Sequence, residues 1–474
     1  MKLYLIIKIK QFANNSLFSY KLLILTLTIL TCISCDPFVD TELPNSEITG
    51  VSVFEDDVTV DAALSNIYAE LREYSFLSGS GFGISGLMGL YADEFTYYGN
   101  PSITQQDFFS NSVMPSNKDI SNFWNFGYNI IYQSNAIIEG LEQSEEINNS
   151  QKDIFTGEAL FIRALSHYYL LNLFGDIPYI TTTDYRENSS VSRKTEPEIY
   201  QQIKLDLERA KDLLPEEYID SYRTRPNNSV AGALLARLYL YTKDWQTAEK
   251  EASEIINRSN LYELTDNLNE VFLKESSSTI WQLNSGSEGK NTLEALSFKF
   301  TNTPPPSLSL SINFIESIET GDNRMTEWIG FVSSNEQTFY FPNKYKEREN
   351  TGTSLEYSKI FRLAEIYLIR AEARAQQGEL SAALGDLNEI RNRAGLLPLQ
   401  GLTKGELLEA ILKERRVELF SELGHRFFDL KHTGNIQNVL GDIKPGWNSY
   451  NILLPIPENE LITNPNLGVQ NPGY

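Results

Sequence analysis

The chain has few of the residues that build thiol and imidazole chemistry. Its 474 residues include only two cysteines and three histidines. Both cysteines, Cys32 and Cys35, lie near the N-terminus, so the rest of the chain contains neither a disulfide nor a cysteine-based zinc site. The histidines, at positions 167, 425 and 432, each fall in or just after a predicted helix. We therefore expect no catalytic triad, no metal site and no cofactor.

Common catalytic motifs are also missing. The sequence has no Gly-x-Ser-x-Gly elbow, no His-Glu-x-x-His and no P-loop. One dinucleotide-like pattern occurs, Gly81-Phe-Gly83-Ile-Ser-Gly86, but it follows a predicted helix instead of a strand. A nucleotide site needs a strand before the glycines and a helix after them. The pattern is therefore interpreted as a loop.

The chain has fewer basic than acidic residues. Lys and Arg total 40 against 63 Asp and Glu, which gives a formal net charge of −23. Such a chain repels nucleic acid and anionic lipid head groups, so we expect no nucleic-acid partner. Any membrane attachment must come from acyl chains, because no basic patch is available.

Long apolar runs are absent beyond a short one at residues 22–30, which follows Lys21. This run is too short to span a bilayer, which takes about 20 apolar residues. It is typical of a signal-peptide apolar region. The sequence Ser34-Cys35 after it resembles the lipobox of bacterial lipoproteins, with cleavage after Ser34 and lipidation of Cys35. An ordinary secretory cleavage nearby, or Cys32 as the acceptor, are the alternatives.

These features divide the chain into three parts. Residues 1–34 are predicted to be the signal peptide, and residues 35–47 a polar, lipid-anchored tether containing Pro37 and Pro44. Residues 48–474 then form a single domain.

Helical periodicity dominates that domain. Apolar residues recur every three or four positions, and Pro197 stands at an N-terminal turn. The periodicity predicts helices over residues 60–74, 119–141, 152–174, 197–214, 229–241, 245–257, 358–377, 380–393 and 404–424.

Two predicted hairpins match at a constant offset. Ala236, Trp245, Ala248 and Ile255 superpose on Ala371, Leu380, Ala383 and Ile390. Small residues at such positions allow close helix packing, as in tetratricopeptide-like units that stack into a superhelix. Two unrelated helical hairpins are the alternative.

Two irregular blocks interrupt the helices, at residues 76–114 and 261–357. The second contains strand-like runs at 279–283 and 338–341. Long loops on a helical scaffold often carry function, so the ligand site is expected in these blocks.

Charged residues suggest two further interpretations. The adjacent carboxylates Asp93 and Glu94 are a candidate glycosidase pair. Loop capping or hydrogen bonding to a ligand is the favoured interpretation of these two residues.

A second group of charged residues lies at helical spacing, which favours a buried structural ion-pair network over a catalytic role. It comprises Arg362, Glu365, Arg370 and Glu372, with Glu414, Arg415, Arg416 and Glu418 as partners and Arg426 and Asp429 as further members.

The order of several motifs is distinctive. They are Glu158-Ala-Leu-Phe-Ile-Arg163, Leu173-Phe-Gly-Asp-Ile-Pro178, Ala233-Leu-Leu-Ala-Arg-Leu-Tyr-Leu240, Arg362-Leu-Ala-Glu365, Asn388-Glu-Ile-Arg-Asn-Arg-Ala-Gly395, Gly424-His-Arg-Phe-Phe-Asp-Leu430, Leu454-Pro-Ile-Pro457 and Gln470-Asn-Pro-Gly-Tyr474. Together they resemble the SusD/RagB family of outer-membrane nutrient-binding lipoproteins over nearly the whole mature chain.

The resemblance implies a mainly α-helical, tetratricopeptide-like superhelical scaffold whose long loops and short strands carry the ligand site. It also implies a surface-exposed, lipid-anchored protein of the outer membrane. The implied partner is a SusC-like TonB-dependent transporter. The implied ligand is an oligosaccharide or polysaccharide, with peptide as a lesser possibility, bound and handed over without covalent chemistry.

Ligand-binding residues are expected among aromatic and polar side chains of the two blocks, because sugar rings stack on aromatic faces. Asp93, Tyr97, Tyr98 and Asn100 are the candidates in the first block. Asn284, Asn323, Arg324 and Trp328 are those in the second. Trp281 and Trp124 are expected in the core. An exported glycoside hydrolase and a protein-binding helical scaffold are the competing hypotheses.

Overall fold

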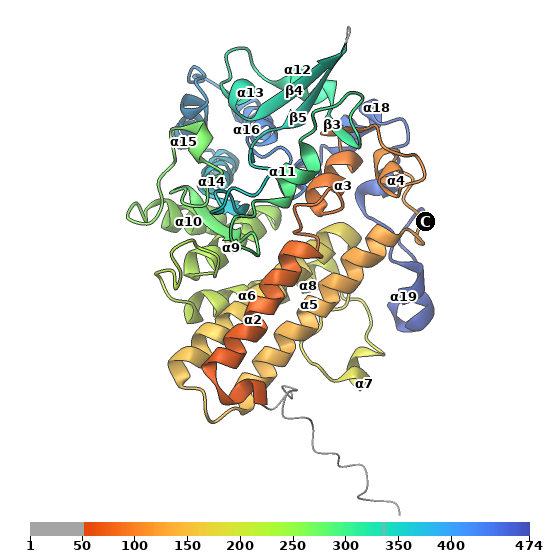
Figure 1. Ribbon diagram of the computed structural model, residues 1–474, viewed down its shortest axis with the longest axis vertical. Helices are drawn as coiled ribbons and strands as arrows, with labels where there is room; N and C mark the ends of the chain where they lie inside the picture. Colours follow the sequence, from red (N-terminus) through yellow and green to blue (C-terminus); the bar gives the residue numbers. More distant parts are fainter. Residues whose placement is uncertain (1–51, 335–336) are drawn as a thin grey trace, which may run out of the picture. The chain divides into compact units, whose positions relative to one another are not determined.

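Successive helices form most of the body of the protein (Figure 1). The computed structural model describes residues 52–334 and 337–474, so the predicted leader, tether and Cys35 lie outside the described residues. The long helices are α2 (Asp57–Glu73), α5 (Lys118–Gln143), α6 (Asn149–Phe174), α8 (Glu196–Leu213), α9 (Asn228–Tyr241), α10 (Trp245–Ile256), α14 (Leu363–Gln377), α15 (Leu380–Arg393) and α16 (Lys404–Glu418).

Capping residues explain where several helices begin and end. The Asp56 carboxylate accepts a hydrogen bond from the Val58 amide at the start of α2. Thr403 and Glu406 form a reciprocal capping box at the start of α16. Gly378, with φ of 88°, ends α14 in the left-handed conformation that glycine adopts at little cost.

The helices pack in sequence order. α5 packs on α6, α6 on α8, α8 on α9, and the series continues through α10, α14 and α15 to α16. The matching positions Ala248 and Ala383 are both fully buried, which lets each hairpin close tightly. The predicted class, mainly α with tetratricopeptide-like hairpins, is confirmed.

The strands form two small antiparallel sheets. One has the order β1 (Phe95–Tyr97), β3 (Leu308–Leu310), β5 (Gln337–Pro342) and β4 (Ile329–Ser334). The other pairs β2 (Thr279–Leu283) with β6 (Ser358–Arg362). Both predicted strands are confirmed, but the predicted helix 358–377 begins five residues late, because its first turn pairs with β2.

The first irregular block is more ordered than its sequence predicts. It contains α3 (Ile84–Tyr91), whose eight residues are all buried, and α4 (Gln105–Phe109). A Cβ at Gly86 would lie 2.4 Å from the Gly81 carbonyl oxygen, so the glycines allow close backbone packing around α3. The apolar helix shows no amphipathic period because it is buried on all sides.

The C-terminal region corrects a second prediction. The helix predicted over 404–424 ends at Glu418, and a separate helix starts after Gly424, whose φ is 70°. The remaining helices are α7 (Tyr185–Asn188), α11 (Leu293–Phe298), α12 (Ile312–Ser317), α13 (Arg324–Glu327), α17 (His425–His432), α18 (Ile436–Ile443), α19 (Glu458–Thr463) and the 3₁₀ turns η1 (Ser52–Glu55), η2 (Leu268–Glu270), η3 (Ser449–Ile452) and η4 (Pro465–Leu467).

Aromatic side chains fill the core where the helices meet the two-stranded sheet. Trp281 is fully buried and stacks on Phe361 with ring centroids 6.1 Å apart, and Phe161 meets it edge-on at 5.1 Å. Trp124 is also buried, so both core predictions are confirmed. Among the helices described, none has the length and apolar character needed to cross a membrane.

Candidate ligand-binding site

Burial separates the predicted ligand-binding residues into two groups. Asp93, Arg324 and Trp328 are almost completely enclosed by protein. The Trp328 indole donates a hydrogen bond to the Leu268 carbonyl at 2.9 Å. A ring with no exposed surface cannot stack on a sugar, so the prediction for Trp328 is corrected to a core role.

Arg324 is corrected for a different reason. Its guanidinium is committed to the carboxylates of Asp322 at 2.7 Å and Glu418 at 3.0 Å. Its neighbour Asn323 is exposed but packs beside Gly395 at the end of α15, and it does not line the cavity that contains Asn284.

Asp93 is held by two arginines. Its carboxylate pairs with Arg416 and with Arg426, each at 2.7 Å. Burial raises the pKa of Asp93, but the charges of Arg426 and Arg416 outweigh it and lower the pKa below its usual value. Burial and the charge of Asp93 raise the pKa of Glu94 to about 8. Both carboxyls are enclosed, so this pair is positioned for structure, and the geometry gives the glycosidase hypothesis no support.

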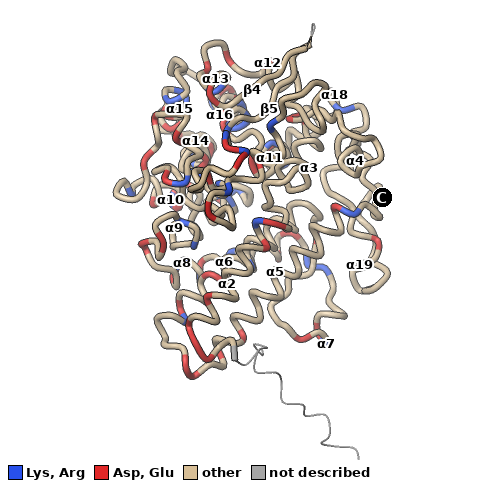
Figure 2. Tube along the Cα trace, in the orientation of Figure 1, with Lys and Arg blue, Asp and Glu red and all other residues tan. Residues whose placement is uncertain are grey.

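The predicted buried ion-pair network is confirmed, with altered partners. Arg362 pairs with Glu418 and with Glu422, each at 2.8 Å, and Glu418 also binds Arg393 at 2.6 Å. Burial alone would raise the pKa of Glu418. The charges of the surrounding arginines lower it more, so its pKa lies well below the usual range. Figure 2 shows acidic and basic residues side by side around α13, α14 and α16. We call this group the Glu418 cluster.

Glu414 joins that cluster through Arg324, at 2.7 Å, and other members pair outside it. Glu365 binds Arg237 of α9 at 2.7 Å, which ties the two hairpins together. Further pairs join helices elsewhere in the scaffold: Arg370 with Asp386, Arg415 with Asp429, and Glu372 with His432.

Tyr97 and Tyr98 point in opposite directions, as adjacent residues of an extended chain do. Tyr97 is buried, and its hydroxyl donates to the Asn100 carbonyl at 3.0 Å. Tyr98 is 39% exposed and meets Phe339 of β5 edge-on, with ring centroids 5.3 Å apart. Tyr98 and Asn100 are therefore accessible, and their contact with a ligand stays a prediction.

Asn284 lines a cavity. Its side-chain oxygen accepts hydrogen bonds from Arg72 Nη1 at 2.6 Å and from the Gly286 amide at 3.0 Å. Arg72, at the end of α2, also pairs with Glu73 at 2.8 Å. Two adjoining cavities of about 200 and 260 Å³ share Arg72 and Asn284 in their walls. We call the two cavities together the Arg72 hollow.

One wall of the hollow is formed by two loops that Asn291 fastens together. Its amide donates to the Glu349 carbonyl at 3.1 Å and to the Thr351 hydroxyl at 3.0 Å, and its oxygen accepts from the Leu355 amide. The same loops place the exposed cations Lys290 and Arg348 at the hollow.

Another wall comes from α2 and the loop before α9. Arg225 is fixed there by Glu158 and Asp61, each at 2.6 Å. The Asp220 carboxylate accepts hydrogen bonds from the backbone amides of Thr224 and Arg225, so this loop is held in place. Both walls are therefore organised before any ligand arrives.

Exposed aromatic rings stand near the hollow. Tyr74 follows Glu73 directly, is 64% exposed and stacks on Phe126 at 6.1 Å. Tyr222, in the loop that includes Asp220, is 38% exposed and meets Tyr357 edge-on at 5.9 Å.

α11 connects the hollow with β1, which directly precedes Tyr98. Leu296 of α11 lines the hollow and is 49% exposed, while Phe298 stacks on Phe95 of β1. Glu294 fixes the helix by accepting a hydrogen bond from the Ser358 hydroxyl at 2.8 Å. Aromatic faces beside mixed donors and acceptors suit a polyhydroxylated ligand that also has apolar surface.

The sequence patterns do not identify several residues of this site. Arg72 lies in a regular helix, where an arginine usually means a solvated face, and the sequence does not show that the helix end borders a cavity. Tyr222 lies outside both irregular blocks. Its position between Asp220 and Arg225 in a Pro-flanked loop was the available signal.

Comparison with known proteins agrees with this architecture. A family model described as "Starch-binding associating with outer membrane" matches residues 55–240, and one described as "SusD family" matches residues 323–474. A SusD-like protein of Formosa agariphila is 27% identical over 96% of this chain and 99% of its own length. The starch-binding protein SusD of Bacteroides thetaiotaomicron is 38% identical over 24% of this chain and 21% of its own length.

Solved structures of SusD-like proteins have a similar fold. A SusD superfamily protein of Bacteroides vulgatus has the same fold, with a TM-score of 0.78, 22% identity and coverage of 89% of this chain and all of its own. A structure named "Laminarin binding SusD-like protein" has a TM-score of 0.76 and 28% identity over 89% of this chain and all of its own. The chain therefore belongs to the SusD/RagB family.

Proposed function

We propose that this protein binds an oligosaccharide or polysaccharide in the Arg72 hollow. The observation that carries the proposal is the hollow itself, where Arg72 and Asn284 meet between two fastened walls with exposed aromatic rings nearby. The family supports a carbohydrate ligand, and one related structure is named for binding laminarin. Tyr98 and Asn100, reached across α11, extend the proposed contact surface.

The proposal also covers cellular location and partner. A lipid on Cys35 anchors the chain at the outer-membrane surface, and a SusC-like TonB-dependent transporter receives the saccharide from it. The family description, which refers to association with the outer membrane, supports this arrangement. Transfer requires no covalent step, so the hollow must bind reversibly.

A glycan and peptide array probed with the mature protein tests the binding proposal. We expect saccharides to be retained and Arg72→Ala and Asn284→Ala to lose them, with Tyr185→Ala as the control, because Tyr185 is 73% exposed on α7 and lines neither cavity of the hollow. Retention of peptides alone would favour the protein-binding scaffold.

The anchor is tested separately with Cys35→Ala in cells. Two or more acyl chains hold a protein at a bilayer far more firmly than one. The variant should therefore be released in soluble form or remain an uncut precursor. A processed variant that stays on the cells and incorporates a fatty-acid probe would show that the lipid is attached elsewhere.

A further inference from the structure

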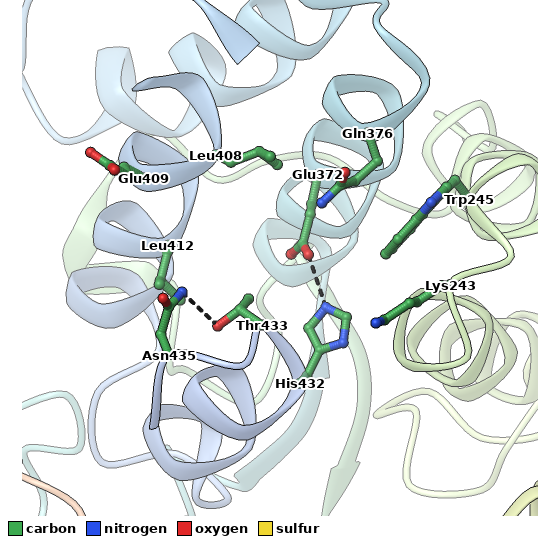
Figure 3. A pocket seen from close by; sticks show the side chains of 10 residues that line it. All are labelled: Lys243, Trp245, Glu372, Gln376, Leu408, Glu409, Leu412, His432, Thr433 and Asn435. Carbon is green, nitrogen blue, oxygen red and sulfur yellow. Dashed lines mark hydrogen bonds and ion pairs between the residues drawn. The ribbon is translucent and has the colours of Figure 1, made fainter. Parts of the chain in front are cut away.

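A second cavity, of about 370 Å³, shares no lining residue with the Arg72 hollow. It lies among α14, α16, the end of α17 and the turn between α9 and α10 (Figure 3). Its volume falls in the range of small-molecule sites. The pair of Glu372 with His432, described above, lies in its wall.

Two facing walls of the cavity are apolar. Figure 3 shows Trp245 on one side and Leu412 on the opposite side, with the Glu372 carboxylate pointing into the space between them. Trp245 is only partly buried. The walls therefore form a slot in which one face of a flat ring can lie against the indole.

The polar group inside the slot is incompletely bonded. The Glu372 side chain is 6% exposed, and one of its oxygens faces His432 Nε2 at 2.8 Å. The His432 ring is fixed by stacking on Tyr241, with centroids 4.7 Å apart and planes 7° apart. Within the part of the chain that the structure describes, the second oxygen of Glu372 accepts no hydrogen bond. A carboxylate oxygen that faces open space without a protein donor can accept a hydrogen bond from a ligand.

Further hydrogen-bonding groups belong to residues that line the cavity. The side chain of Gln376, the indole N–H of Trp245 and the side-chain oxygen of Asn435 all lie at the wall without a bond to another described residue. The slot thus offers donors and acceptors close to an aromatic face. Sugar hydroxyls both donate and accept, and a sugar ring has an apolar face, so a saccharide matches every feature.

We propose that this cavity is a second saccharide-binding site, which takes a short saccharide between Trp245 and Leu412 with a hydroxyl donating to Glu372. The inference rests on the proposed function, since it assigns the same ligand class to a separate place. A lysine or arginine side chain of a partner protein fits less well, because Lys243 lines the same cavity and His432 already faces the carboxylate.

The chain offers a selective reporter for this site. Of its five tryptophans, Trp124, Trp281, Trp328 and Trp447 are buried, and Trp245 is not. Intrinsic fluorescence that responds to a ligand therefore reports mainly on Trp245. The protein to use is the full chain in detergent carrying Arg72→Ala and Asn284→Ala, which disable the hollow.

The probes are neutral trisaccharides of glucose, mannose, galactose and xylose, with N-acetylarginine amide as a separate arm. We expect at least one trisaccharide to change the emission saturably. Glu372→Gln keeps the indole and should weaken that response about tenfold, because it removes a charge-assisted hydrogen bond. Trp245→Phe should abolish the emission change, and Tyr185→Ala should leave it unchanged. Melting temperatures near that of the parent protein confirm that each variant is folded.

The outcomes separate this inference from the proposed function. If trisaccharides bind the parent protein by calorimetry but never change the Trp245 emission, the second site is refuted and the hollow stands. If no trisaccharide binds the parent protein, the second site is refuted, and retention on the glycan array decides the proposed function. A saturable response to N-acetylarginine amide alone would assign the cavity to a basic peptide and overturn the saccharide assignment.

Discussion

The Glu418 cluster and the Arg72 hollow use the same residue types for different purposes. In the cluster, Arg362 is 2% exposed, and its guanidinium donates to groups of Glu418 and Glu422. In the hollow, the Arg72 side chain is 16% exposed, and its two partners, Glu73 and Asn284, sit at the edge of open space. Protein encloses the first guanidinium, whereas the second borders space that a ligand can enter.

The difference shows that burial, more than residue type, decides which polar groups are available. A charge enclosed between helices must be paired completely to be tolerated, so its partners are fixed by stability. A charge at a cavity wall can exchange water for ligand groups. Replacing a residue of the cluster should therefore lower stability but leave saccharide affinity unchanged. Replacing a residue of the hollow should lower saccharide affinity but leave stability unchanged.

The largest expected effect is on stability in the cluster. Arg362→Ala leaves Glu418 and Glu422 short of a buried partner, and breaking such a pair costs about 3–5 kcal/mol. Calorimetry should show a melting temperature several degrees lower, while the folded variant still binds saccharide. Arg348→Ala, an exposed arginine of the hollow, is the matched control and should melt like the parent protein. An unchanged melting temperature together with lost binding would move Arg362 into the site.

The next effect is on affinity in the hollow. Arg72→Ala removes a charged donor, and hydrogen bonds to charged groups contribute about 1.5–3 kcal/mol, which is roughly tenfold to a hundredfold in affinity. Isothermal titration with a saccharide retained on the array measures it. The melting temperature should change little. Unaltered affinity would show that the ligand binds outside the hollow.

A third prediction concerns pH and the enclosed carboxyl of Glu94. Its pKa is raised to about 8 by burial and by the charge of Asp93, so the folded protein keeps a proton that the unfolded chain releases above about pH 4.5. Unfolding then releases a proton, and stability falls as pH rises from about 5 to 8. The loss is at most about 1.4 kcal/mol per pH unit.

Glu94→Gln isolates this contribution from other groups that titrate in the same range. Thermal unfolding of both proteins at pH 5.5 and pH 8 should show the parent protein losing stability relative to the variant at the higher pH. Parallel behaviour of the two proteins would mean that Glu94 is ionised in the folded state.

The smallest effect separates two adjacent tyrosines. Tyr98→Ala removes an exposed ring, and aromatic stacking contributes about 0.5–1.5 kcal/mol beyond its contact area, so saccharide affinity should fall several-fold without loss of stability. Tyr97→Ala removes a buried ring and should lower the melting temperature instead. If neither variant binds more weakly than the parent protein, the aromatic platform lies at Tyr74 or Tyr222.

Much of the fold could be predicted from the sequence because amphipathic helices carry a periodic signal. The hairpins α9–α10 and α14–α15 and the buried charges of α14 and α16 follow from that signal, whereas β2 follows from its strand-like composition. Helix α3 does not follow from it, because burial on every side removes the period. The predicted helix includes β6 because this strand runs directly into α14 with no turn residue between them.

The site could be predicted only in part. Tyr98, Asn100 and Asn284 are accessible, as their loop positions suggest, whereas Asp93, Arg324 and Trp328 are enclosed. Sequence patterns place a residue in a loop but do not show whether another segment covers it. Arg416 and Arg426, which enclose Asp93, lie more than 300 positions away along the chain, at separations of 323 and 333.

A crystal structure of the protein with a saccharide retained on the array tests the central claim most directly. We predict electron density for the sugar in the hollow, within hydrogen-bonding distance of Arg72 and Asn284 and against an exposed ring of Tyr74, Tyr222 or Tyr98. A saccharide bound at full occupancy elsewhere, with the hollow filled only by water, would contradict the account.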